Sequence, residues 1–193
     1  MISKIDICNL ALAQLGQSPI SSLEQENEKA RRLKLFYAPV RDEVLRTHNW
    51  AFAGVEEPLV LLEEQPDLQG NFIYKYPSQA LFIRSVLDAG HNRLAFQEAF
   101  RPELHSRVLL VRSLQALAQY TYRIVDENLF DAAFIKSFSL ALACDLAVAL
   151  TADTQLAAQL LQKYTLSLEE ARRSNTAENF VTMSSQDAFT EVR

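Results

Sequence analysis

The chain has 193 residues, of which 19 are lysine or arginine and 24 are aspartate or glutamate, giving a formal charge of −5. This length predicts one core with room for an inserted lobe, and an apolar content of 49% excludes global disorder. The acidic balance excludes a general affinity for phosphate backbones or anionic lipid.

The N-terminal residues predict a short helix. Ser3 and Asp6 have the spacing of a capping box, which marks a helix start. Apolar residues then recur at helical spacing: Ile5, Cys8, Leu12 and Leu15. Gly16 follows, where glycine can take the left-handed conformation that ends a helix, and Pro19 prevents the helix from resuming.

A second, longer helix is predicted from about residue 26 to residue 48, just before the only tryptophan. Pro39 lies inside it and should kink or split it, because proline lacks the N–H that the helix needs. A glycine-stopped helix, a proline turn and a long charged helix are features of a scaffold. The residues assigned structural roles here are Gly16, Pro19, Arg41, Arg46 and Trp50.

The segment 54–125 has the pattern of strands, because prolines and glycines separate short runs rich in β-branched and aromatic residues. Residues 81–87 and 93–96 flank a predicted hairpin loop at 88–92. Residues 118–125 alternate apolar with polar side chains, the period of a half-buried strand, and residues 106–112 are its predicted partner.

After residue 126 the helical period returns. Phe130, Phe134 and Phe138 stand at four-residue intervals, and an almost wholly apolar run continues to residue 150. This run predicts a helix that is covered on most sides, and it is too short for a membrane span. A final helix should begin near residues 151–153 and fade after Arg173.

Asp145 is the one charged residue inside the apolar run. A buried carboxylate without a partner is costly, so the sequence predicts a cation beside it, either Arg41 or Arg46. On that interpretation Asp145→Asn should destabilise the fold.

Together these elements predict a mainly α fold. We expect an antiparallel helical bundle of about four helices, with a β-rich insertion between the second and third helices and an extended C-terminal tail. The bundle is assigned to residues 1–53 and 126–179, the insertion lobe to 54–125 and the tail to 180–193.

No motif points to catalysis. The three histidines, His48, His91 and His105, lack the spacing of a metal motif, and the four glycines are too scattered to cradle a phosphate. Cys8 and Cys144 lie far apart in apolar segments and are interpreted as reduced core residues. The sequence therefore predicts no enzyme activity, no cofactor and no metal site.

One resemblance emerges from the order of several short motifs. They are residues 7–16 (ICNLALAQLG), the Pro19-Ile20 turn with Ser22-Leu23, residues 41–46 (RDEVLR), residues 50–53 (WAFA), residues 122–126 (YRIVD), residues 129–131 (LFD) and residues 140–147 (LALACDLA). In this order they resemble the head-to-tail adaptor, or connector, family of tailed bacteriophages, which includes the tail tubular protein A type. The resemblance covers about two thirds of the chain and is weakest at residues 59–113 and in the last dozen.

The resemblance implies a virion protein of the tail or neck, synthesised in the host cytoplasm. Such a protein forms a ring of its own copies below the portal protein, typically a dodecamer, and extends the DNA ejection channel. It offers a platform to a downstream tail or nozzle protein and lets double-stranded DNA pass without sequence-specific binding or a membrane. Residues implied to dock on the portal are Phe180, Val181, Met183 and Phe189.

A second interpretation comes from another class: a small helical regulatory or nucleic-acid-binding protein. It predicts a symmetric dimer that binds DNA with a steep salt dependence, whereas the adaptor predicts a ring with little affinity for free DNA.

Overall fold

The computed structural model describes residues 2–63 and 65–179, the last five of these by their backbone alone. It is 47% helical and 22% strand, with four α-helices and two antiparallel sheets that hold seven strands. The fold is therefore mixed α and β, and the prediction of a mainly α helical bundle is wrong. The reason is that the segment expected as a β-rich insertion has enough alternating apolar residues to build two sheets around a core of their own.

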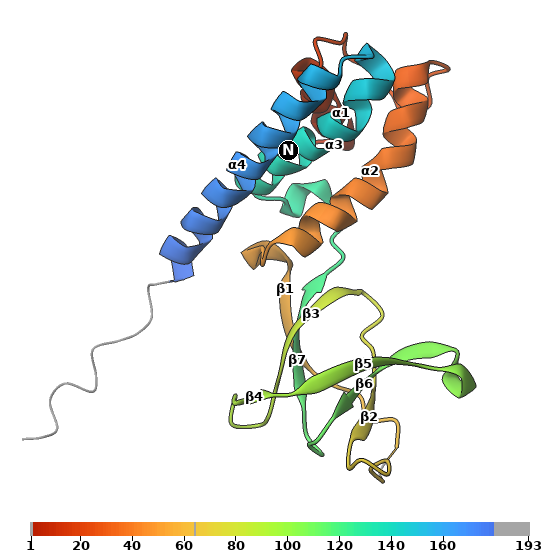
Figure 1. Cartoon of the computed structure of the whole chain (residues 1–193), viewed down its shortest axis with the longest axis vertical. Helices are drawn as coiled ribbons and strands as arrows, with labels where there is room; N and C mark the ends of the chain where they lie inside the picture. The colour runs from red at the N-terminus through yellow and green to blue at the C-terminus, as the bar shows by residue number, and fades with distance from the viewer. Residues whose placement is uncertain (1, 64, 180–193) are drawn as a thin grey trace, which may run out of the picture. The chain divides into compact units, whose positions relative to one another are not determined.

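The chain divides into two compact units (Figure 1). Of the described residues, those up to Val44 and those from Phe130 to Asn179 form the first unit, and those from Leu45 to Leu129 form the second. The first unit is thus built from two separate stretches of chain, whereas the second is continuous in sequence.

Helix α1 (Lys4–Gln14) has defined caps at both ends. At its start, Ser3 and Asp6 form the predicted capping box, in which each side chain binds the other residue's backbone N–H. At its end, Gly16 has a φ of 64°, in the left-handed region. The N–H of Gly16 donates to the Ala13 carbonyl and the N–H of Gln17 to the Leu12 carbonyl, which is the pattern of a Schellman cap.

The loop after α1 is tied back to the helix by Asn9. Its side-chain amide donates to the Ile20 carbonyl at 3.0 Å and accepts from the Ile20 N–H at 2.8 Å. Ile20 is buried, whereas the preceding Pro19 is exposed. Asn9 therefore fixes the path of the loop in the way that a strand partner would.

Helix α2 (Glu28–Thr47) continues through Pro39 as one helix, so of the two outcomes predicted for this proline, a kink or a split, the split does not occur. The helix begins in the first unit, and its residues from Leu45 belong to the second. On its buried face Tyr37 meets the ring of Phe138 edge-on at 4.9 Å between centroids.

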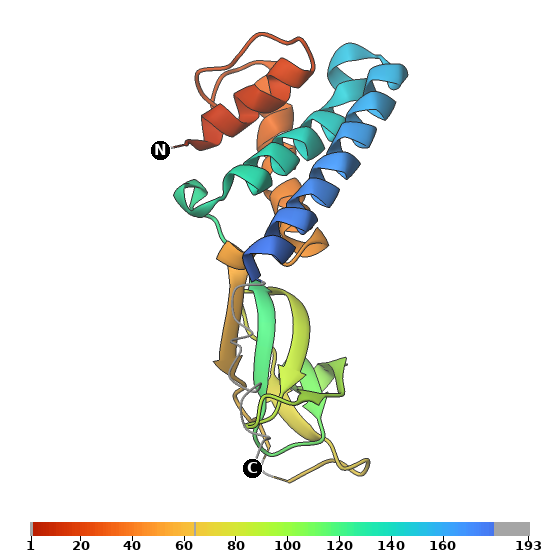
Figure 2. The ribbon, with the colours of Figure 1, turned by 90° about the vertical axis from the view of Figure 1, so that its left-hand side faces the viewer.

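Helices α3 (Ala132–Thr151) and α4 (Thr154–Asn179) lie side by side in opposite directions (Figure 2). Phe130, Phe134 and Phe138 pack ring against ring, although Phe130 precedes the helix. Buried Ser137 and Ser167 are hydrogen-bonded to each other between the two helices. Helix α4 is longer than predicted, because it continues past Arg173.

Of the described helices, α3 alone is long and apolar enough to cross a membrane by length and composition. More than half of it is buried among other residues of the protein, as expected for a core helix. Its burial is nevertheless uneven, because Asp145, Val148 and Ala149 are exposed. The prediction that this helix is covered on most sides is confirmed, and these three uncovered positions lie in its C-terminal half.

The strands of the second unit form two antiparallel sheets. One has the order β1-β7-β3-β4, with β1 (Gly54–Pro58), β7 (Leu117–Tyr122), β3 (Ala80–Leu87) and β4 (Arg93–Leu94). The other has the order β2-β6-β5, with β2 (Phe72–Lys75), β6 (Ser106–Val111) and β5 (Phe96–Arg101). Short 3₁₀ segments lie at Ala51–Ala53, Pro102–Leu104 and Glu127–Leu129.

The predicted pairing of the last two strands is wrong. Strand β6 pairs with β2 and β5, whereas β7 pairs with β1 and β3 in the other sheet. The chain changes sheets between Val111 and Leu117, and Ala116 and Ala118 are buried where it does so. Sequence neighbours usually pair, but here they lie on either side of the shared core of the unit.

Two turns in this unit have the same design. In residues 67–71 and 88–92 an aspartate accepts the backbone N–H groups two and four residues later, at 2.8 to 2.9 Å. These hydrogen bonds, first that from the asparagine at the end of each turn, lower the pKa of Asp67 and of Asp88. The fourth position is left-handed in both turns, with φ 81° at Gly70 and 61° at His91.

The matched turns predict the effect of His91→Gly. Because a residue with a Cβ is strained at this φ, the change should raise the free energy of unfolding by about 1 kcal/mol. The exposed ion pair of His91 with Glu56 contributes little that would be lost. Gly70→Ala is the control, since a Cβ there meets no atom within 4 Å and should lower stability through φ alone. Urea titration measures both, and equal stability of wild type and His91→Gly would contradict the strain.

Candidate functional site

Arg84 on β3 caps the C-terminal end of α2. Its Nη2 donates to the carbonyls of Leu45, Arg46 and His48 at 3.4, 3.1 and 2.7 Å, and its Nε donates to the Thr121 hydroxyl at 2.9 Å. A cation at this end also meets the negative pole of the helix dipole. Burial and the nearby charge of Arg46 lower the pKa of Arg84. Arg84 thus fixes the last turn of α2 to the sheet.

Two of the predicted structural residues lie close to this cap. Arg46 donates to the Leu81 carbonyl at 3.0 Å, and its guanidinium lies 5.7 Å from the ring centroid of Phe82. Trp50 is buried, and His48 meets its ring edge-on. These residues build the start of the second unit, and no cluster of reactive groups surrounds them among the residues that the structure describes.

The predicted cation beside Asp145 is absent from the described residues. Arg41 instead binds the carboxylate of its neighbour Asp42 at 2.7 Å, and Arg46 is engaged by the Leu81 carbonyl. Asp145 lies on an exposed face of α3, so it needs no buried partner. The pKa of its carboxyl is raised because the adjacent protein surface removes part of its hydration and because Glu43 lies nearby.

This arrangement reverses the effect that the sequence predicts for Asp145→Asn. A raised pKa in the folded state means that the ionised carboxylate opposes folding at neutral pH, and that this penalty disappears as the pH falls through the raised pKa toward the ordinary value of 3.8. The change should therefore stabilise the protein at pH 7, by less than about 1 kcal/mol because solvent screens the group.

Thermal unfolding at several pH values measures the effect. The gain should vanish in acid, and Glu26→Gln, at another exposed carboxylate, serves as the control. Lower stability of Asp145→Asn at neutral pH would restore the original interpretation of a stabilising partner.

A row of polar side chains crosses the four-stranded sheet. Ser85 donates to the Gln119 side chain, Gln119 donates to Glu56 at 2.7 Å, and Glu56 lies 3.3 Å from the imidazole of His91. The serine and the histidine stand at opposite ends of this row and are not hydrogen-bonded to each other within the described residues. The row joins the strands and the 88–92 turn.

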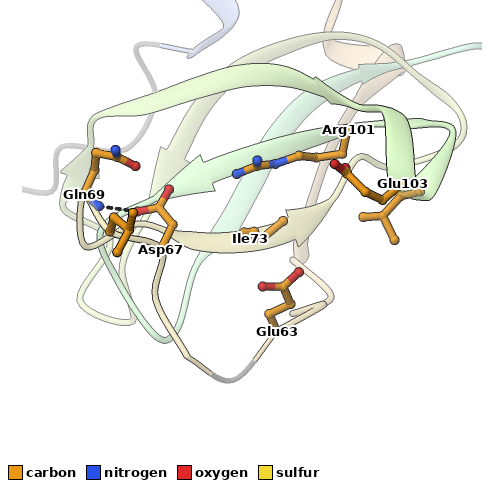
Figure 3. Close-up of a pocket in the computed structure, with 8 residues that line it drawn as sticks. Glu63, Asp67, Gln69, Ile73, Arg101 and Glu103 are labelled. Atoms are coloured by element: carbon orange, nitrogen blue, oxygen red, sulfur yellow. Dashed lines mark hydrogen bonds between the residues drawn. The ribbon is translucent and has the colours of Figure 1, made fainter.

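One pocket of about 410 Å³ lies beside the three-stranded sheet (Figure 3). Arg101 extends across it above Ile73, and its Nε is buried without a hydrogen-bond partner among the described residues. Glu63, Asp67 and Glu103 also line it. The Asp67 carboxylate accepts N–H groups of its own turn and is therefore already engaged.

The α3–α4 hairpin has a groove along one flank. Two adjoining hollows of about 310 and 330 Å³ share Lys136, Ser167 and Glu170, and the Lys136–Glu170 ion pair at 2.6 Å lies between them. Their remaining lining residues are mostly small or flexible: Gln14, Ala132, Ala133, Ser139, Leu140, Lys163, Leu166, Ala171 and Ser174. Sequence reasoning missed this groove because it depends on which faces of two helices meet.

No group of three or more histidine, cysteine or acidic residues that could hold a metal occurs within the described residues. His105 contacts the Pro102 carbonyl in its own turn, and burial raises the pKa of Cys144 to about 11, so its thiol is a poor nucleophile at neutral pH. Cys8 is buried. The docking residues implied by the resemblance, Phe180, Val181, Met183 and Phe189, lie outside the described residues.

No protein-family model matches the chain, and no curated protein matches it either.

Proposed function

We propose that the protein is a structural component of a phage virion, a head-to-tail adaptor that forms a ring below the portal, extends the DNA channel and receives the downstream tail or nozzle protein. The observation that carries the proposal is the role of the residues on which the resemblance rests. Asn9 ties down a loop, Gly16 ends a helix and Trp50 is buried, so the motif residues serve architecture and not chemistry.

The order of the elements also supports the proposal. A unit made from both ends of the chain and a β unit inserted within it provide two separate bodies for two kinds of contact. The apolar residues after Asn179 give a segment that is able to dock on the portal. An acidic chain suits a channel through which DNA slides without sticking.

The test mixes the purified chain with the portal protein of the same phage and images the mixture by electron microscopy. We expect a ring of adaptor copies on one end of the portal, and loss of that ring when the chain is truncated after Asn179. A chain that never joins the portal, and instead binds DNA as a dimer with a steep salt dependence, would replace the adaptor with a regulatory protein.

A further inference from the structure

The α3–α4 hairpin presents different surfaces on its two flanks. Lys136 and Asp145 are nine residues apart on α3, and at about 100° per residue they lie on opposite sides of the helix. Leu161 and Glu170 are also nine residues apart, on α4, and lie opposite each other for the same reason. Because Lys136 and Glu170 pair across the groove, Asp145 and Leu161 belong to the other flank, here called the far flank.

The far flank carries exposed apolar side chains. Val148, one turn from Asp145, is 53% exposed, and Leu161 is 57% exposed. Ala149, next to Val148 in the sequence, is exposed as well. The groove flank differs from it, because it is hollow and the buried residues Ser167 and Ala171 form the floor of the hollow.

The charges of the two flanks are complementary. Asp145 and Glu43 are neighbouring carboxylates, and no ion pair joins either of them to a cation within the described residues. On the groove flank Lys136 is already paired with Glu170, whereas Lys163 forms no ion pair with any residue that the structure describes. One flank therefore has unpaired negative charge and the other an unpaired ammonium group.

We propose that the far flank of one copy sits in the α3–α4 groove of the next copy, with Val148 against Leu140 and Leu166, and with the Asp145 carboxylate paired to Lys163. The inference rests on the proposed ring, because a closed ring needs two different surfaces that fit each other on opposite sides of each copy. The proposed ring does not specify these surfaces, and the inference assigns them to the far flank and the α3–α4 groove.

The position of Asp145 in the free protein supports this pairing. Its ionised carboxylate opposes folding because partial burial removes some of its hydration, because Glu43 is near, and because no described cation forms an ion pair with it, so a neutral residue here would make the isolated chain more stable. A neighbouring Lys163 supplies the missing cation. Asp145→Asn should thus stabilise the free chain and weaken assembly, two effects of opposite sign that a purely structural role would not produce.

The decisive experiment reverses the charges separately. Asp145→Lys and Lys163→Asp, each made in the full chain, should each raise the concentration needed for assembly at least about tenfold, because like charges then meet at every interface. An equimolar mixture of the two variants should assemble again to within about threefold of wild type. In alternating order, every interface of such a mixture joins an acid to a lysine.

Assembly is measured by sedimentation velocity on the chain alone and by electron microscopy with the portal. Glu26→Lys and Arg31→Asp are matched controls, since both residues are exposed and neither forms an ion pair within the described part of the chain. Thermal unfolding confirms that each variant is folded, and Asp145→Lys should fold at least as well as wild type.

Rings that form equally well with either single variant, or that the mixture fails to restore, would overturn this interface while leaving the adaptor intact. A wild-type chain that stays monomeric both alone and with the portal would overturn both proposals.

Discussion

Arg84→Ala should lower the free energy of unfolding of the second unit by about 3 kcal/mol. The change removes a charged donor from three helix-end carbonyls and from the Thr121 hydroxyl, which is buried. A partly buried carbonyl that loses a charged donor costs the fold more free energy than an ordinary hydrogen bond contributes. Arg84→Lys should have an intermediate effect, because an ammonium keeps the charge but cannot reach four acceptors in a fixed fork.

The only tryptophan makes the measurement specific. Trp50 is buried and belongs to the second unit, so its fluorescence during urea titration reports the unfolding of that unit. Arg93→Ala is the control, since Arg93 is exposed on β4 and its side chain makes no hydrogen bond within the described residues. If Arg84→Ala and Arg93→Ala have the same fluorescence midpoint, Arg84 is not a cap.

Phe138→Ala should lower the free energy of unfolding of the first unit by about 4 kcal/mol. Phe138 is fully buried, and its ring packs against Phe134 at 5.6 Å and against Tyr37 at 4.9 Å between centroids. Truncation to alanine leaves a cavity that these rigid rings cannot close, so the lost contacts add to the lost transfer free energy.

Far-UV circular dichroism follows this effect, because all or most of each α-helix belongs to the first unit. Leu35→Ala is the matched control, since Leu35 is 68% exposed on α2 and its loss should change stability by less than about 0.5 kcal/mol. The unfolding midpoint reported by Trp50 fluorescence should shift less than the midpoint reported by dichroism. A shift of both signals together would show that the units unfold as one.

Local patterns in the sequence predict the ends of elements well in this chain. Ser3, Asp6 and Gly16 act within one helix, and the 88–92 turn joins adjacent strands, so each depends on a few neighbouring residues. Asp153 likewise accepts from the N–H groups at the start of α4, where the sequence predicts that helix to begin. Such short-range geometry is encoded directly by the side chains present.

Features that depend on residues far apart could not be predicted in this way. The strand partner of β7 and the amount of β structure depend on which sheet each strand joins, and β6 and β7, although adjacent in sequence, do not pair. The partner assigned to Asp145 was wrong for a similar reason. The apolar residues around Asp145 in the sequence suggested that it is buried. Its exposure depends instead on which part of α3 is left uncovered by α2 and α4.

The Arg84 cap and the α3–α4 groove could not be predicted from the sequence either. Arg84 caps a helix that ends nearly forty residues earlier, and nothing near it in sequence indicates that role. In the sequence Lys163 is indistinguishable from an ordinary solvent-exposed lysine, and only the fold shows that it lines a groove. A sequence pattern cannot reveal an unpaired charge, because pairing is a property of the folded surface.

The two-part construction of the first unit has a consequence during translation. As the chain leaves the ribosome, the apolar faces of α1 and α2 emerge well before α3, which must cover them. The second unit is continuous in sequence, so it is able to fold before α3 has been synthesised and has covered the apolar faces of α1 and α2. Slow elongation between residues 45 and 129 would therefore prolong the exposure of α1 and α2, and chaperone binding should concentrate on the nascent N-terminal stretch.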